Sequence, residues 1–193
     1  NFKQLTVTGR LSCSDINLQN QPDSSKLQDD DIRKDLNLRD VYVADNDKEC
    51  IIAADFSNLE LRILAHYSDD ENLVDAFRRG QDVHSRTALM MFIPDEAEEY
   101  LKKDPLLKNF KSEHSHLRFA GKTLNFALIY GMQPESFAAI MSKIWKRKVS
   151  LQEAEQMYGK YFSSMSGVKN FIHSSHREVR QKGYVTTVLG RKR

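Results

Sequence analysis

The sequence has 193 residues, of which 40% are hydrophobic and 9% aromatic, with 29 lysines and arginines against 27 aspartates and glutamates. The apolar content excludes a disordered chain, and two cysteines exclude a disulfide-stabilised scaffold. No run approaches the roughly 20 apolar residues of a membrane-spanning helix. We therefore expect an intracellular globular protein with no membrane partner, either one domain or a large piece of a bigger one.

The charge is distributed unevenly along the chain. Residues 1–100 carry 11 basic and 21 acidic side chains, whereas residues 101–193 carry 18 basic and 6 acidic ones. The basic half would hold a polyanion such as nucleic acid, and clustered carboxylates in the acidic half could hold divalent cations. Two solvated faces of opposite sign would give the same pattern, so charge alone leaves both interpretations open.

The start and the end of the chain carry the predicted strands. Residues 1–35 are rich in loop-forming residues, and two short strands are expected at 40–44 and 50–55, joined by an Asp/Asn turn. The segment GYVTTVLG, at 183–190, predicts a closing strand before a basic turn.

The rest of the chain is expected to be nearly all helix. Ser57 and Glu60 fit a capping box, and apolar residues repeat at helical spacing behind it, at Leu59, Ile63, Leu64 and Tyr67. Gly80 and Gly183 are placed to end two helices. Further helices are predicted at 71–79, 82–92, 95–103, 114–130, 135–146, 151–163 and 167–182.

Two carboxylates near the first helix could carry chemistry. Asp55 follows the apolar run IIAA directly, where a carboxylate is held rigidly and can bind a metal ion. Helix caps and turns use aspartate in the same position, and the capping box already accounts for Glu60. These residues alone leave a structural role open for both.

A more specific pattern lies in the segment RFAGKTLNFALIYG. Its residues Arg118, Lys122, Phe126 and Tyr130 recur every four positions, and each step rotates only about 40° around a helix. All four therefore share one face, with two cations followed by two aromatic rings. Cations suit phosphate oxygens and rings suit bases or sugars, so this face could bind a nucleoside triphosphate. An amphipathic helix with buried rings and exposed cations would show the same spacing.

Both segments resemble motifs of a known family. ADFSNLELRILAH, at 54–66, resembles motif A of the family A DNA polymerases, and RFAGKTLNFALIYG, at 118–131, resembles their motif B. Residues 8–22, 69–88 and 167–193 are similar to further family segments in the same order. The segments NLQNQP and HSRTALMMF look most like those of plant and protist organellar polymerases. This resemblance suggests a mitochondrion or plastid, with the nucleus and the cytoplasm as alternatives.

The resemblance implies catalytic roles for Asp55 and Lys122. Asp55 would be one of two carboxylates that hold two Mg²⁺ ions, with the main-chain carbonyl of Phe56 completing the metal site. Glu60 would be the steric gate that excludes ribose. The implied deoxynucleoside triphosphate site consists of Phe56, Ser57, Asn58, Leu59, Glu60, His84, Arg118, Lys122, Phe126 and Tyr130. Taken alone, His84 would be read as a surface histidine in an acidic stretch.

The resemblance also implies a fold and partners. The expected class is α+β and mostly helical, with a partial palm at 1–68, fingers at 69–165 and a return towards the palm at 166–193. The implied partners are primer–template DNA and deoxynucleoside triphosphates, and the protein is expected to be monomeric. The implied DNA contacts are Arg10, Asn17, Gln19, Tyr130, Gly131 and Arg191.

The second catalytic carboxylate of the family lies in a motif C that this chain does not contain. We therefore expect a fragment that binds nucleic acid weakly and catalyses nothing by itself. Two other functions stay open. A single-subunit RNA polymerase shares an Arg/Lys helix ending in Tyr-Gly, although Glu60 argues against it, and a non-catalytic nucleic-acid-binding protein derived from a polymerase would also fit.

Overall fold

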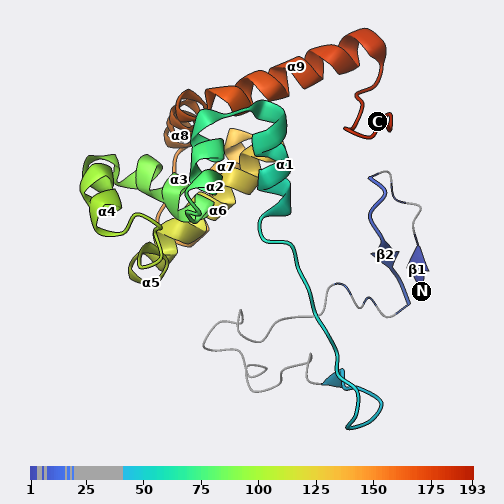
Figure 1. Cartoon of the computed structure of the whole chain (residues 1–193). Coiled ribbons are helices and arrows are strands. Elements are labelled where there is room, and N and C mark those ends of the chain that lie inside the picture. The colour runs from blue at the N-terminus through green and yellow to red at the C-terminus, as the bar shows by residue number, and fades with distance from the viewer. Residues whose placement is uncertain (4–5, 7, 16, 18, 20–40) are drawn as a thin grey trace. The chain divides into compact units, whose positions relative to one another are not determined.

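The computed structural model describes the chain except residues 4–5, 7, 16, 18 and 20–40 (Figure 1). The chain divides into two compact units, one formed by residues 1–56 and 186–193 and the other by residues 57–185. The second unit contains the helices. Most of the loop predicted before residue 35 lies outside the described residues. Asp40, the start of the first predicted strand, also lies outside them.

Each predicted helix is present in the helical unit, with small changes at its ends. The helices are α1 (Leu59–Ser68), α2 (Glu71–Arg78), α3 (Val83–Phe92), the short 3₁₀ helix η5 (Pro94–Glu96), α4 (Ala97–Lys103), α5 (Phe110–Glu113), α6 (Ser115–Ile129), α7 (Pro134–Trp145), α8 (Leu151–Ser164) and α9 (Ser166–Lys182). Gly183, at φ 79°, ends α9 as predicted, and Gly80 lies just beyond the end of α2.

The core of this unit is formed where α3 and α6 pack side by side. Leu124 on α6 is fully buried, as are Leu61, Phe137 and Tyr161 on helices around it. The close approach depends on Gly121, because a Cβ there would lie 2.5 Å from the carbonyl oxygen of His84 on α3. A larger residue at position 121 would separate the two helices.

Two carboxylates, one buried and one half-buried, fix the starts of two helices. Asp70, 2% exposed, caps α2 by accepting the backbone N–H groups of Asn72 and Leu73, and it also accepts those of Gly167 and Val168 in α9. Asp82 caps α3 by accepting the N–H of Ser85 at 3.0 Å. The bonds of Asp70 therefore make the positions of α2 and α9 mutually dependent.

The other unit contains little regular structure among its described residues. Strand β1 (Phe2–Lys3) pairs antiparallel with β2 (Ser12–Cys13), with Phe2 opposite Cys13. Near the end of the chain, Thr186 and Lys192 form an isolated antiparallel bridge around a turn in which Gly190 donates to the carbonyl of Thr187. The closing strand predicted at 183–190 is therefore only partly present, as one arm of this short turn.

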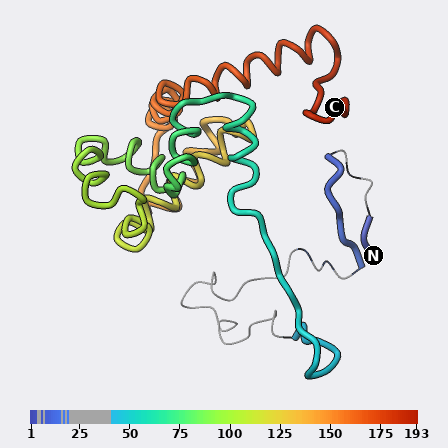
Figure 2. Tube along the Cα trace, in the orientation of Figure 1, coloured from blue at the N-terminus to red at the C-terminus, as the bar shows by residue number. Residues whose placement is uncertain are grey.

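The two strands predicted before the first helix are wrong in their described part. Residues 41–44 and 50–55 form no strand, and Figure 2 shows residues 51–56 as an extended trace. A strand requires a hydrogen-bonded neighbour, and none of the described residues pairs with this segment. Its apolar side chains are accordingly uncovered, with Ile51 60% and Ile52 86% exposed.

The predicted start of the first helix is also wrong. The residue before α1 is Asn58, in the left-handed conformation at φ 53° and without a side-chain cap, so Ser57 and Glu60 form no capping box. The buried residues of α1 are Leu61, Leu64 and Ala65, whereas three of the four residues predicted for its apolar face, Leu59, Ile63 and Tyr67, are exposed. The helical spacing was correct, but the buried face is centred about a third of a turn away from the predicted one, and only Leu64 belongs to both.

Two further helices differ from prediction at their starts. The segment predicted as a helix from residue 95 begins with the 3₁₀ turn η5, which has Pro94 as its first residue. The helix predicted from residue 114 begins at Ser115, after a break at His114 that separates it from α5. The predicted class, α+β and mostly helical, is confirmed. No helix in the described residues is long and apolar enough to cross a bilayer.

Candidate nucleotide site

The predicted face of α6 exists as a continuous row. The rings of Phe126 and Tyr130 stack with centroids 6.4 Å apart and planes at 12°. The Nζ of Lys122 lies 5.9 Å from the Phe126 ring, and Arg118 follows one turn earlier. Phe126 and Arg118 are half-buried and Lys122 and Tyr130 are exposed. The row therefore presents two cations and two stacked rings along about 18 Å of helix.

His84 joins this face from α3. Its ring centroid lies 5.7 Å from that of Phe126, and the residue is 3% exposed. Its Nδ1 lies 3.1 Å from Nδ2 of Asn125, whose Oδ1 accepts hydrogen bonds from the hydroxyls of Thr87 and Tyr161. The surface interpretation of His84 is therefore wrong, because packing of α3 against α6 buries it.

These contacts set the protonation of His84. Asn125 directs its amide nitrogen at Nδ1, so the imidazole accepts there and carries its proton on Nε2. Burial, opposed by the charge of Asp82 and reinforced by those of Arg118 and Lys122, lowers the pKa of His84 to about 4. At neutral pH the ring is uncharged and can act as a hydrogen-bond donor through Nε2.

Arg118 is held in place by Asp82. Its Nε and Nη2 donate to the two carboxylate oxygens at 2.7 and 3.0 Å. Burial raises the pKa of Asp82, but the hydrogen bonds from Arg118 and Ser85 outweigh burial and keep the pKa below its ordinary value. The guanidinium is therefore fixed before any ligand arrives, and it has donors left for one.

Glu60 lies at the other end of the face. The hydroxyl of Tyr130 donates to its Oε1 at 2.8 Å, which joins α1 to the end of α6. This bond directs the carboxylate towards Tyr130. Gly131 follows at φ 70° and lets the chain turn away from α6.

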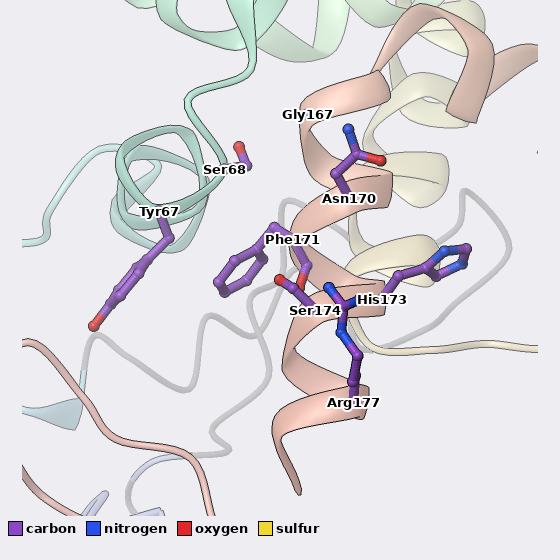
Figure 3. Close-up of a pocket in the computed structure, with 8 residues that line it drawn as sticks. All are labelled: Tyr67, Ser68, Gly167, Asn170, Phe171, His173, Ser174 and Arg177. Carbon is purple, nitrogen blue, oxygen red and sulfur yellow. The ribbon is translucent and has the colours of Figure 1, made fainter. Parts of the chain in front are cut away.

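The helical unit includes a cavity beside the α6 face and another away from it. One, of about 510 Å³, is bounded by Arg118 and Asp82 and also by Ser57 and Asn58, two more residues of the predicted nucleotide site. The other, of about 630 Å³, lies between α1 and α9, where Tyr67 stacks on Phe171 at 5.6 Å (Figure 3). No residue predicted to bind nucleotide or DNA lines this second cavity.

One family model matches the whole chain. The model of DNA polymerase family A covers residues 1–193. The chain belongs to DNA polymerase family A. It is 35% identical to DNA polymerase I of Geobacillus stearothermophilus over 98% of its length, and 36% identical to the thermostable DNA polymerase I of Thermus aquaticus over 97%.

The similarity extends to a solved family structure. The POL domain of Pol1 from M. smegmatis, in complex with DNA primer-template and dNTP, superposes on the entire chain with a TM-score of 0.71 and 31% identity. The match supports the polymerase fold expected from the sequence. The family A chain covers only 18% and 19% of the two bacterial relatives, and 29% of the solved chain.

Other predicted residues of this family A chain lie in the first unit or at its border. Asp55 and Phe56 are exposed at the end of the extended segment. Gln19 donates its side-chain amide to the carbonyl of Leu11 and its backbone N–H to Asn17. The side chain of Arg191 packs against the backbone of Gly9. A Cβ added to Gly9 would lie 2.3 Å from Nη1 of Arg191. Arg191 therefore lies beside the segment that contains Arg10.

Metal ligands are incomplete in the described part of this family A chain. It contains no group of three or more His, Cys, Asp or Glu side chains placed to hold an ion. Asp55 offers one carboxylate, which does not by itself form a two-ion site. The described residues therefore do not fit the complete magnesium centre that the family resemblance implies.

Neither the role of Asn125 nor the pairing of Asp82 with Arg118 was predicted from the sequence. Asn125 follows Leu124 on the buried side of α6, and a polar side chain at such a position needs several partners. That requirement was a signal for a buried hydrogen-bond network. Asp82 stands three residues before Ser85, a spacing that indicated a cap but not its second partner, 36 residues away.

Proposed function

We propose that the full-length protein to which this chain belongs synthesises DNA on a template, adding deoxynucleoside triphosphates to a primer 3′-hydroxyl. The observation that carries this proposal is the α6 face, with fixed Arg118 at one end, stacked Phe126 and Tyr130 at the other, and Glu60 bonded to Tyr130. Family membership and the relatives named DNA polymerase I support it.

Different side chains would contact different parts of the nucleotide. Arg118 and Lys122, about 6 Å apart along α6, would hold the triphosphate and stabilise the charge that moves to the departing pyrophosphate. His84, uncharged, would donate from Nε2 to a phosphate oxygen. Phe126 would pack on the sugar and base, with Ser57, Asn58 and Leu59 along the other side of the nucleotide.

Sugar choice and template contact belong to the Tyr130 end of the face. Glu60 would occupy the space of a ribose 2′-hydroxyl, and its bond to Tyr130 holds it there. Tyr130 and Gly131 would lie beside the templating base. Arg10, Asn17, Gln19 and Arg191 would contact primer and template through their exposed polar groups.

For the metal ions, we propose that Asp55 and the carbonyl of Phe56 contribute ligands to Mg²⁺ in the full-length protein. The bound ions would activate the primer hydroxyl and neutralise pyrophosphate. The palm assignment of residues 1–68, the fingers at 69–165 and the return at 166–193 form part of the same proposal, as do a monomeric state and an organellar location.

Primer extension by the full-length protein with Mg²⁺ tests the function. We expect extension with deoxynucleotides, little with ribonucleotides, and none in Asp55→Ala. Asp95→Ala, an exposed carboxylate on η5, is the matched control and should extend normally. Preferential use of ribonucleotides would favour an RNA polymerase. Binding of primer–template without extension in the unchanged protein would favour a non-catalytic nucleic-acid-binding protein.

A further inference from the structure

The cavity bounded by Arg118 and Asp82 carries an excess of positive charge. Its walls include Arg62, Lys108, Lys111 and Arg118, against the single carboxylate of Asp82. Asp82 is paired with Arg118. Two cations of the wall, Lys108 and Lys111, make no ion pair or side-chain hydrogen bond with any residue that the structure describes.

Both lysines are mounted on a rigid support. Asp104 accepts the backbone N–H groups of Asn109 at 2.7 Å and Phe110 at 3.4 Å. Leu107 and Phe110 are fully buried, on either side of Lys108, and pack against α3. Lys108 and Lys111 thus extend from a segment whose backbone is anchored at both sides, while their own side chains are exposed.

The support is also joined to the residue that holds Arg118. Gln81 donates from Nε2 to the carbonyl of Pro105 at 2.7 Å, and Asp82 follows it directly. Leu107 adopts φ 56°, a conformation that a leucine rarely takes and that persists only where the surroundings impose it. The segment from Asp104 to Lys111 is therefore fixed relative to Arg118, which Asp82 holds.

We propose that Lys108 and Lys111 bind the terminal phosphates of the nucleoside triphosphate and the pyrophosphate it leaves, extending the Arg118–Lys122 row into this cavity. The inference rests on the proposed function, because it places the triphosphate along α6. Lys122 lies one turn above Arg118, and Arg118 lines the cavity, so a triphosphate that starts at Lys122 ends between Arg118 and the two lysines.

A compact polyphosphate fits this arrangement better than a DNA backbone does. The cations face one concave space from several directions, with Arg62 and Arg118 on elements other than that of the lysines. A nucleic-acid backbone is instead followed by cations spread along an open groove. Exposed lysines on a fixed backbone can close around phosphate oxygens without any rearrangement of the fold.

The test is single-turnover nucleotide incorporation by the full-length protein carrying Lys108→Gln and Lys111→Gln. We expect the apparent Kd for the deoxynucleoside triphosphate, and the inhibition constant of inorganic pyrophosphate, to rise about tenfold, with the Kd for primer–template unchanged. The matched control is Lys102→Gln with Lys103→Gln on α4, which removes the same charge from two exposed lysines paired with Glu98 and Glu99. The control should behave like the unchanged protein.

Binding of inorganic triphosphate, measured by calorimetry on the same proteins, makes the inference independent of extension. Weaker binding in the Lys108/Lys111 variant alone would support it even if the unchanged protein extended no primer, which would contradict only the proposed function. Unchanged triphosphate binding and pyrophosphate inhibition would overturn the inference while leaving the polymerase proposal intact. Weaker primer–template binding with normal nucleotide affinity would also overturn it, and would assign the lysines to DNA.

Discussion

At the scale of single residues, the contact of Glu60 with Tyr130 leads to a prediction about the choice of sugar. Its Oε1 accepts the Tyr130 hydroxyl at 2.8 Å and it forms no capping box. We predict that Glu60→Ala in the full-length protein admits ribonucleotides, because the space beside the sugar opens. Tyr130→Phe, which removes the bond but keeps the carboxylate, should reduce discrimination less. Single-turnover incorporation of matched deoxy- and ribonucleotides measures both effects.

Two other results would change the role assigned to Glu60. Unchanged sugar discrimination in Glu60→Ala would remove the gate role and leave Glu60 as a structural partner of Tyr130. Equal loss of discrimination in both variants would mean that the hydrogen bond, and not the bulk of the carboxylate, excludes the ribose.

His84 predicts a dependence of stability on pH. Its pKa is about 4 in the folded chain against an ordinary value of 6.5, so the unfolded chain binds the proton more readily. Stability is therefore lost as the pH falls from 6.5 towards 4. Between about pH 7.5 and 5, this one group should cost about 2 kcal/mol of the free energy of unfolding.

Denaturant unfolding of the chain, followed by the fluorescence of its single tryptophan, Trp145, measures this cost. His84→Gln should reduce the loss of stability between the two pH values by about 2 kcal/mol, whereas other titrating groups contribute equally to both proteins. An identical loss in the variant would mean that His84 is not held uncharged by burial.

At the scale of elements, Asp70 links the starts of α2 and α9. One carboxylate, 2% exposed, accepts four backbone N–H groups, from Asn72, Leu73, Gly167 and Val168. We predict that Asp70→Ala lowers the free energy of unfolding by about 3 to 5 kcal/mol, because it leaves buried donors unpaired. Glu71→Ala, which removes an exposed charge next to it, should cost about 0.5 kcal/mol.

The same unfolding measurement decides this prediction. A loss in Asp70→Ala within about 1 kcal/mol of that in Glu71→Ala would show that water or a neighbouring group satisfies the four donors.

Elements were predictable to the extent that their signals are local. Helix spacing and Gly183 identified the helices to within a few residues, since a helix makes its hydrogen bonds within itself. The strands at 40–44 and 50–55 failed because a strand depends on a partner that local pattern does not supply. The face of α1 failed because Leu59, Ile63 and Tyr67 share the spacing of a buried face without being covered.

In the candidate site, too, local features were predictable from the sequence and long-range contacts were not. The row from Arg118 to Tyr130 was predictable, because four-residue spacing on one helix fixes which side chains share a face. The burial of His84, its contact with Asn125 and the ion pair of Asp82 with Arg118 join residues about 36 to 41 positions apart. Only the packing of α3 against α6 around Gly121 brings these residues together.

At the scale of the whole molecule, the two units carry different parts of the proposed chemistry. The helical unit contains the α6 face, Glu60 and His84, and the other contains Asp55, Phe56, Arg10 and Arg191. Loss of Arg118 or Lys122 in the helical unit should therefore affect nucleotide use, and loss of exposed cations in the other unit should affect DNA binding. Separate titrations of nucleotide and primer–template distinguish these two effects.

The central claim, that the α6 face binds the triphosphate, is tested most directly by Lys122→Ala in the full-length protein. Single-turnover incorporation gives its apparent Kd for the deoxynucleoside triphosphate and its maximal rate, and fluorescence anisotropy gives its Kd for primer–template. We predict at least about a tenfold loss in the ratio of rate to nucleotide Kd, with primer–template affinity unchanged. Normal incorporation with weakened primer–template binding would contradict the claim and assign α6 to the path of the DNA.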